Sequence, residues 1–231
     1  MTAPEWLQPL LGSVDEFTVW GRAVGAAPPG IRRSAVLVLF GEGPHGPDVL
    51  LIQRSAHLRS HAGQPAFPGG GLDQPDESAV AAALREAEEE TGLDPAGVDV
   101  LAVLAELWVP PSGNVVTPVL GWWRAPSDVS PADVREVASV ARVPIADLVD
   151  PANRLQVRAP SGRLGVAFEV ADMLVWGFTA AVLDRLLDLG GWVKPWDTAR
   201  VVDLPEETLR LAMRQRRFEP DTESAGEGGS S

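Results

Sequence analysis

The sequence predicts an α/β protein in which helices cover both faces of a mixed β-sheet, an α/β/α sandwich. Two observations lead to this class. Segments with the two-residue period of strands alternate along the chain with segments of helical period. The chain of 231 residues is 45% hydrophobic and contains eight Trp, which is enough to fill the core of one domain.

The first element is a short helix around Trp6, Leu7, Leu10 and Leu11, followed by a linker at 26–30 that is rich in Ala, Pro and Gly. We therefore expect three parts: a helical extension with its linker, a main domain, and a loosely held, low-complexity acidic tail. Their bounds are 1–29, 30–218 and 219–231.

The main domain begins with two predicted strands, 34–40 and 48–53, and the turn between them is rich in Gly and Pro, which indicates a hairpin. Two further strands, a strand followed by a short helix, a second hairpin and two helices follow. Their ranges are 100–108, 115–123, 135–143, 145–149, 156–170, 176–189 and 205–217.

The most informative stretch is an acidic helix in which Glu86, Glu89 and Glu90 stand at i, i+3 and i+4. Three like charges within one turn repel each other, and a divalent cation relieves that repulsion. Carboxylate oxygens suit Mg²⁺ or Mn²⁺, whereas the lack of Cys, and of His in this stretch, argues against zinc. An acidic helix that is simply solvated is the alternative.

Signals at both ends support this helix. Asp76 and Ser78 are typical of a helix start, and Gly92 is typical of a helix end. A glycine-rich loop, 67–71, precedes it, and its backbone can approach a ligand closely and offer the Gly71 carbonyl to a metal. A loop and a helix therefore converge on one point.

The spacing of these residues resembles the Nudix hydrolase signature: Gly71, Glu77, and then the run from Arg85 to Leu93. Ala87 stands where the family usually has a bulkier aliphatic residue, which should affect helix packing more than chemistry. The resemblance implies the α/β/α sandwich with a mixed sheet and metal-dependent hydrolysis of a diphosphate bond in a nucleotide derivative. Homodimers are common in this fold, but the sequence identifies no interface.

A second block, 50–70, resembles the additional motif of the coenzyme A diphosphatase branch of this family. The matching positions are Leu50, Leu51, Arg54, Ser55, Arg59, Gly63, Phe67, Pro68, Gly69 and Gly70. Ile52 replaces a threonine that is common in that branch, so a hydroxyl contact from this position is lost. The resemblance implies coenzyme A, or a thioester or oxidised form of it, as substrate, with 3′,5′-ADP and 4′-phosphopantetheine as products.

Within this scheme Glu86, Glu89, Glu90 and the Gly71 carbonyl are the expected metal ligands. Arg54, Arg59, Gly69 and Gly70 are the expected substrate-binding residues, because cations beside a glycine-rich turn suit an anionic substrate. Each arginine could instead pair with a surface carboxylate.

Arg85 is expected to organise the carboxylates rather than touch substrate, pointing away from the metal face toward Glu77 or a loop. The general base stays open. Glu86 is one candidate, and Glu136, Asp133 and Glu106 from later segments are others. We favour Glu136, because it begins a predicted strand after the proline-bounded loop 126–131.

Composition limits the partners. A net charge of −13 and a pI near 4.6 disfavour nonspecific binding to nucleic acid or membrane surfaces. The absence of Cys, of a signal peptide and of a long apolar run predicts a cytoplasmic protein. Other nucleotide substrates, such as ADP-ribose, a dinucleoside polyphosphate or an oxidised nucleotide, remain alternatives. A non-catalytic nucleotide-binding module is another, but the intact carboxylates argue against it.

Overall fold

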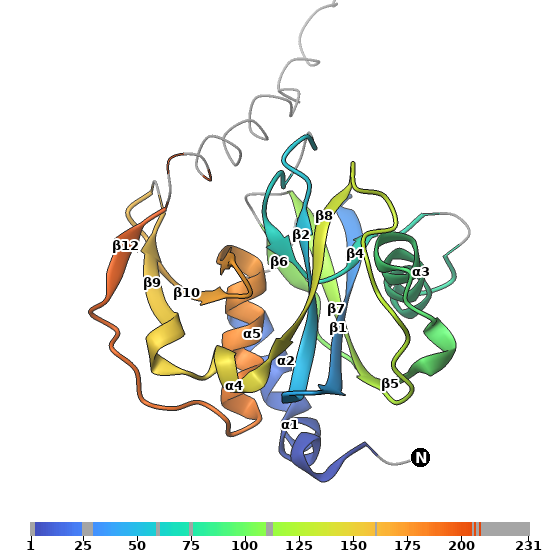
Figure 1. Ribbon diagram of the computed structural model, residues 1–231, viewed down its shortest axis with the longest axis horizontal. Coiled ribbons are helices and arrows are strands. Elements are labelled where there is room, and N and C mark those ends of the chain that lie inside the picture. Colours follow the sequence, from blue (N-terminus) through green and yellow to red (C-terminus); the bar gives the residue numbers. More distant parts are fainter. Residues whose placement is uncertain are drawn as a thin grey trace, which may run out of the picture.

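The computed structural model describes residues 3–24, 30–58, 61–73, 76–109, 113–159, 161–204, 206 and 208, with backbone only at 22–24. Two β-sheets stand with a helix between them, and a further helix covers the outer face of the larger sheet (Figure 1). The mixed α/β class predicted from the sequence is confirmed. Within the described residues, no helix combines the length and apolar character needed to cross a membrane.

The larger sheet is built around the predicted first hairpin. Strands β1 (Arg32–Gly43) and β2 (Gly46–Arg54) pair antiparallel. Strand β7 (Asn114–Trp123) runs parallel to β1, which makes the sheet mixed. Strands β5 (Val98–Val103) and β8 (Val137–Pro144) add antiparallel neighbours to β7 and β2.

At one end of this sheet β1 and β2 diverge, and the glycine-rich loop fills the gap. Strand β3 (Pro65–Ala66) pairs with β2, and β4 (Gly69–Gly71) pairs with β1. Between them the Leu37 N–H donates to the Pro68 carbonyl at 2.8 Å. The segment 65–71 is therefore held by hydrogen bonds to both strands, and the predicted loop 67–71 within it is held to β1.

Helix α3 (Ala79–Thr91) is the acidic helix, and its ends follow the sequence signals. The Ser78 hydroxyl accepts a hydrogen bond from the Ala81 N–H at 3.2 Å, and Gly92 ends the helix with φ 70° in the left-handed region. Its buried face, which includes Ala87, packs with Leu37 and Leu39 of β1. The small Ala87 side chain is completely buried in this contact.

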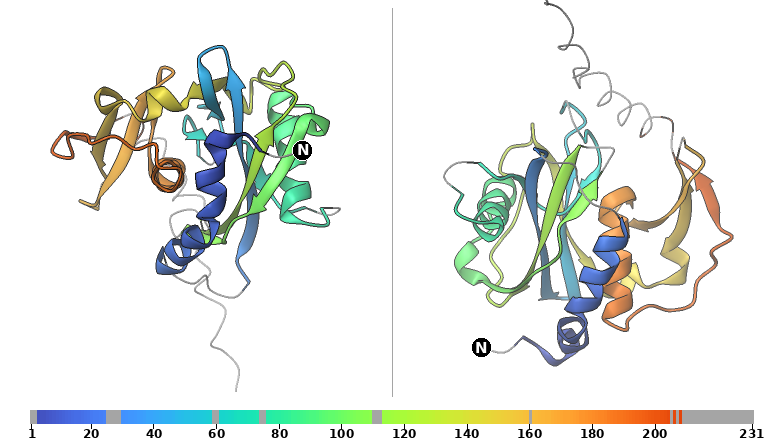
Figure 2. Two further views of the ribbon diagram at one scale, coloured as in Figure 1. Left: turned by 90° about the horizontal axis from the view of Figure 1, so that it is seen from below. Right: turned by 180° about the vertical axis from the view of Figure 1, so that it is seen from behind.

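The opposite face of the sheet, with Val38 and Phe40, packs against helices from both ends of the chain. The N-terminal helices are η1 (Glu5–Leu7), α1 (Gln8–Gly12) and α2 (Val14–Val24). Helix α5 (Gly177–Leu189) lies beside α2, as the view from behind shows (Figure 2). The expected extension thus contributes Leu7, Leu10 and Phe17 to the main core.

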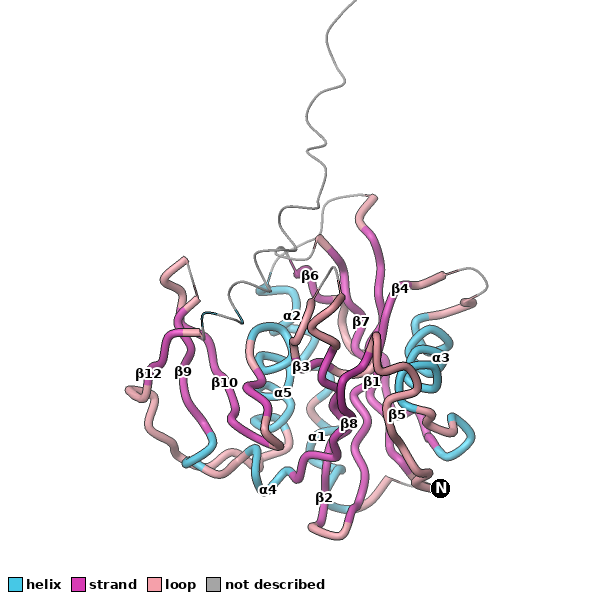
Figure 3. Tube along the Cα trace, turned by 45° about the horizontal axis from the view of Figure 1, so that its top comes forward, coloured by secondary structure: helices cyan, strands magenta, loops and turns pink. Residues whose placement is uncertain are grey.

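The sequence did not predict the second sheet. The hairpin expected at 156–170 forms, but it joins a separate sheet in the order β11-β10-β9-β12. The strands are β9 (Arg154–Arg158), β10 (Leu164–Val170), β11 (Met173–Val175) and β12 (Val201–Asp203). It packs on the side of α5 that faces away from the larger sheet (Figure 3).

The single strand expected at 100–108 is wrong, because the chain forms β5 and then β6 (Leu107–Val109). Both pair with β7, and the break lies opposite Pro118. The Pro118 carbonyl accepts from Leu104, but proline has no N–H to continue the ladder on that side. The ladder therefore stops for three residues.

The remaining elements agree with the sequence within a few residues. Helix α4 (Ile145–Leu148) follows Pro144, and the short helical turns η2 (Pro95–Gly97) and η4 (Pro151–Asn153) are additional. The helix expected at 205–217 lies outside the described residues except at 206 and 208.

Candidate active site

The site is centred on Glu90, which is 5% exposed and receives hydrogen bonds from two other segments. Its Oε1 accepts from Arg54 Nη1 of β2, and its Oε2 accepts from the Gly69 N–H of β4, both at 2.9 Å. Burial raises the pKa of Glu90 to about 7, although both donors oppose that shift. One carboxylate thus joins the helix, the glycine loop and the end of β2.

Arg54 is only partly used by this contact. Its side chain keeps 22% exposure, and its buried Nε has no hydrogen-bond partner among the described residues. The pairing with a carboxylate, raised from the sequence as the alternative to phosphate binding, does occur, but one ion pair leaves other donors of the guanidinium open. Arg59 lies outside the described residues, so its expected role stays a prediction.

Arg85 forms the second centre of the site. Its Nε and Nη2 bind both oxygens of Asp76 at 3.1 and 2.9 Å, and Nη2 also donates to the Gly71 carbonyl at 3.2 Å. The hydrogen bonds from Arg85 lower the pKa of Asp76, and the same contact raises the pKa of Arg85. Arg85 therefore fastens the segment before α3 and the glycine loop to the helix.

Of the two partners expected for Arg85, Glu77 or a loop, the structure shows the loop: Asp76 and the Gly71 carbonyl accept from the guanidinium, while Glu77 is exposed. The expected direction is wrong. Arg85 does not point away from the acidic face, since Nη1 pairs with Glu86 at 3.0 Å and Glu89 at 2.9 Å. An i, i+4 partner and an adjacent residue are both within the reach of so long a side chain.

Gly69 is required by space, and Gly70 lies against the end of a side chain. A Cβ on Gly70 would overlap the carboxylate of Glu86, and a Cβ on Gly69 would overlap the Ala35 carbonyl of β1. The loop backbone therefore lies directly against the acidic face of α3. Gly71 has more room, and its contribution is the carbonyl group that Arg85 contacts.

The donors in this cluster fit a hard divalent cation. Burial, with additional repulsion from Glu89 and Asp73, raises the pKa of Glu86, and Glu86 in turn raises that of Glu90. Mutual repulsion of half-buried carboxylates is what a bound Mg²⁺ or Mn²⁺ relieves. Here the arginines neutralise them, and across the described part of the chain no three His, Cys, Asp or Glu side chains converge in a metal-binding arrangement.

The candidate bases differ in their partners. Glu106 pairs with Arg33, and Asp133 pairs with Arg135, whose hydrogen bonds lower the pKa of Asp133. Glu136 lies one residue before β8 rather than at its first residue, and its side chain is exposed with no hydrogen bond or ion pair to the described residues. Its carbonyl accepts from the Ser55 N–H at 2.8 Å, which places this segment beside the end of β2.

Arg32 is a residue that the sequence reading missed. Its Nη2 lies 3.8 Å from the position that a Cβ on Gly71 would occupy, and it makes no hydrogen bond or ion pair within the described residues. Its neighbour Arg33 is paired with Glu106. The available signal was a pair of arginines immediately before an apolar strand, but only the pairing of β1 with β4 brings Arg32 to the glycine loop.

The residues at 30–162 match the model of the NUDIX domain, and this range contains the glycine loop, α3 and Glu136. The chain belongs to the Nudix family. Nudix hydrolase NudL of Escherichia coli K12 is 41% identical over 174 residues, which cover 71% of this chain and 85% of NudL. NudL of Shigella boydii gives the same identity and coverage.

A solved Nudix structure supports the fold. The Nudix hydrolase RenU from M. smegmatis matches with a TM-score of 0.50 and 24% identity, over 75% of this chain and 94% of RenU. The protein is thus a Nudix hydrolase that acts on the pyrophosphate bond of a nucleoside diphosphate derivative, and Nudix hydrolases generally need divalent metal ions.

Proposed function

We propose that this Nudix hydrolase cleaves the diphosphate bond of coenzyme A, or of its thioester or oxidised forms, to 3′,5′-ADP and 4′-phosphopantetheine. The observation that carries the proposal is the environment of Glu90. The block at 50–70 supplies Arg54 and Gly69, and both bind this carboxylate of the signature helix. The block that suggests the substrate therefore lies at the carboxylates that suggest the chemistry.

In this proposal Glu86, Glu89, Glu90 and the Gly71 carbonyl hold Mg²⁺ or Mn²⁺. When bound, the metal supplies positive charge for the diphosphate and a water of lowered pKa. Arg85 is the residue that keeps these groups together, because it contacts Gly71, Glu86 and Glu89 at once.

The other assignments concern proton transfer and substrate. Glu136 accepts the proton of the attacking water, and its lack of a partner among the described residues leaves it available for that role. Arg54 and Arg59 bind the phosphates, and the backbone of Gly69 and Gly70 lies against them. A cysteine-free chain fits a reducing compartment, so we place the enzyme in the cytoplasm.

The test is product analysis by mass spectrometry in ¹⁸O-labelled water. The purified enzyme receives coenzyme A, dephospho-coenzyme A, ADP-ribose, a dinucleoside polyphosphate and an oxidised nucleoside triphosphate, each with Mg²⁺ and with Mn²⁺. We expect 3′,5′-ADP and 4′-phosphopantetheine from coenzyme A at the highest kcat/KM, with ¹⁸O in one product naming the attacked phosphorus. Preferential turnover of ADP-ribose, with coenzyme A left intact, would refute the substrate assignment.

A further inference from the structure

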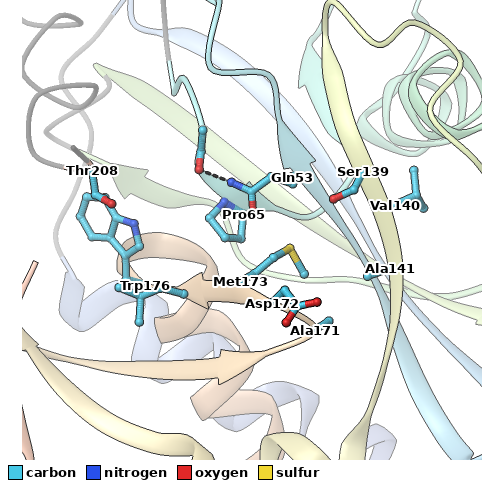
Figure 4. A pocket seen from close by; sticks show the side chains of 12 residues that line it. Gln53, Pro65, Ser139, Val140, Ala141, Ala171, Asp172, Met173, Trp176 and Thr208 are labelled. Carbon is cyan, nitrogen blue, oxygen red and sulfur yellow. Dashed lines mark hydrogen bonds between the residues drawn. The ribbon is translucent and has the colours of Figure 1, made fainter. Parts of the chain in front are cut away.

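A cavity of about 450 Å³ lies between the two sheets, on the face of β2 opposite α3 (Figure 4). Its walls come from the end of β2, from β3, from β8, and from the turn between β10 and β11. Its volume falls within the range of small-molecule sites. None of the residues described for the carboxylate cluster lines it.

The cavity is tied to the candidate active site by two neighbouring residues. Gln53 lines the cavity, whereas Arg54 pairs with Glu90. Successive side chains of a strand point to opposite faces of the sheet. The Gln53 side chain therefore lies on the face with the cavity, and the Arg54 side chain lies on the face with the carboxylate cluster. The cavity and the carboxylate cluster are therefore on the two sides of one strand end.

The loop that follows β2 accepts hydrogen bonds from both residues at this strand end. The Arg54 N–H donates to the Gln64 carbonyl at 3.0 Å, and the Gln53 side chain donates to the Gly63 carbonyl. Gly63 and Pro65 line the cavity, and both come from the 50–70 block. The block thus borders two sites, of which only one contains the carboxylates.

The polar groups of the cavity exclude an anionic occupant. Asp172 contributes a carboxylate, and no Lys, Arg or His is among the described residues that line the space. Gln53 and Ser139 are cross-strand partners on β2 and β8, so an amide and a hydroxyl stand side by side on one face. A phosphate would meet repulsion here, while a neutral chain with amide groups finds donors and acceptors.

The remaining walls are mostly apolar, with Thr208 as a further polar residue. Pro65 faces Met173 across the space, and the Trp176 ring lies at one side (Figure 4). Ala171 and Asp172 form the two-residue turn between β10 and β11, and both have positive φ, of 50° and 57°, as a type I′ hairpin turn requires. The hairpin therefore sets the position of this wall.

We propose that this cavity receives the neutral pantetheine arm of the substrate, while the diphosphate lies at the carboxylate cluster beyond the end of β2. The inference rests on the proposed function, since coenzyme A has one strongly anionic end and one neutral end with two amides. The lining selects the neutral end. The arm passes around a single strand end to join the two sites.

The first experiment measures binding of free pantetheine, which has no phosphate, to the full chain by saturation-transfer NMR. Ser139 is substituted by Ala, Leu and Trp, a series that fills the cavity progressively from an exposed strand position that tolerates such side chains. Ser161→Trp, in the exposed turn at the other end of the second sheet, is the matched control. The nucleotide product 3′,5′-ADP is the comparison ligand.

We expect pantetheine to bind wild type and Ser161→Trp alike, and to bind Ser139→Ala about threefold more weakly because the hydroxyl is lost. It should bind at least tenfold more weakly to Ser139→Trp, with Ser139→Leu between Ser139→Ala and Ser139→Trp. Binding of 3′,5′-ADP should change less than twofold throughout the series. The inference is overturned if wild type does not bind pantetheine, if Ser139→Trp binds it normally, or if both ligands are lost together.

The second experiment separates this inference from the proposed function. Steady-state kinetics with coenzyme A should show a KM at least tenfold higher in Ser139→Trp, with little change in kcat. An inactive wild type would refute the coenzyme A assignment alone, because the pantetheine titration reads the cavity without any turnover. Equal KM values in Ser139→Trp and wild type would remove the cavity from substrate binding.

Discussion

The site contains two arginine–carboxylate centres that differ in burial. Glu90 and Arg54 form a buried pair, and burial raises the Glu90 pKa to about 7. Arg85 binds Asp76, Glu86 and Glu89 nearer the surface, and its hydrogen bonds lower the Asp76 pKa. The comparison teaches that the first centre holds a carboxylate that is costly to ionise, whereas the second holds the surrounding segments in place.

The largest expected effect comes from breaking the first centre. Glu90→Gln should lower kcat by about two orders of magnitude or more, because a charged metal ligand and charge-stabilising group is lost. Glu88→Gln is the matched control, since Glu88 is exposed on another side of the same helix, and its kcat should stay within about twofold of wild type.

Circular dichroism and thermal melting report whether each variant folds. Glu89→Gln belongs to the same prediction and should behave like Glu90→Gln. Normal turnover in both Glu89→Gln and Glu90→Gln would remove these residues from the catalytic site.

Breaking the second centre should have a somewhat smaller effect. Arg85→Ala removes the contacts to Asp76, Glu86, Glu89 and Gly71 together, so we expect kcat to fall roughly 30-fold and the free energy of unfolding to fall by about 1 to 2 kcal/mol. Arg85→Lys keeps the charge but loses the two-pronged contact with Asp76, so it should recover only part of the activity.

Steady-state kinetics and urea unfolding measure the two effects of Arg85. If Arg85→Lys restores full activity, charge alone is what the site needs. In that case Arg85 does not act by fastening the loop to the helix.

The raised pKa of Glu90 should make the contribution of the first centre to stability depend on pH. In metal-free protein with EDTA, between about pH 4.5 and 7, Glu90 keeps a proton in the folded state. The same carboxyl group has already lost its proton in the unfolded chain. The folded-state pKa is raised, so this contribution to stability is complete below about pH 4.5 and is lost as the pH rises to about 7. The loss is on the order of 3 kcal/mol.

Urea unfolding of wild type and Glu90→Gln between pH 4.5 and 8 measures this contribution. The difference between the two proteins should change across that window, with Glu90→Gln gaining relative stability as the pH rises. Parallel curves would show that Glu90 ionises in the folded protein as it does in the unfolded chain.

The smallest expected effect concerns Arg32, which has no partner among the described residues and lies beside the loop. Arg32→Ala should raise KM about three- to tenfold, because an exposed cation near the glycine loop attracts the anionic substrate without fixing its geometry. Arg33→Ala, whose side chain is instead paired with Glu106, is the control and should leave KM within about twofold. Kinetics at low and high salt check the assignment, since the Arg32 effect should shrink as salt rises.

The sequence by itself determined the features that depend on local spacing. Helical geometry alone puts Glu86, Glu89 and Glu90 within one turn. The Ser78 side chain caps the first turn of the helix, and Gly92, whose backbone is left-handed, ends its last turn. The hairpin of β1 and β2 also follows from a local pattern. These predictions need no knowledge of distant contacts.

Only the tertiary structure decided which distant groups meet. Arg54 and Glu90 are 36 residues apart, and their pairing depends on β3 and β4 filling the gap where β1 and β2 diverge. Helical period gives the face on which Arg85 lies but not the path of the segment before the helix, so the choice of Asp76 by Arg85 was not predictable. The second sheet and the cavity behind Gln53 have the same origin, because they arise where separate segments pack together.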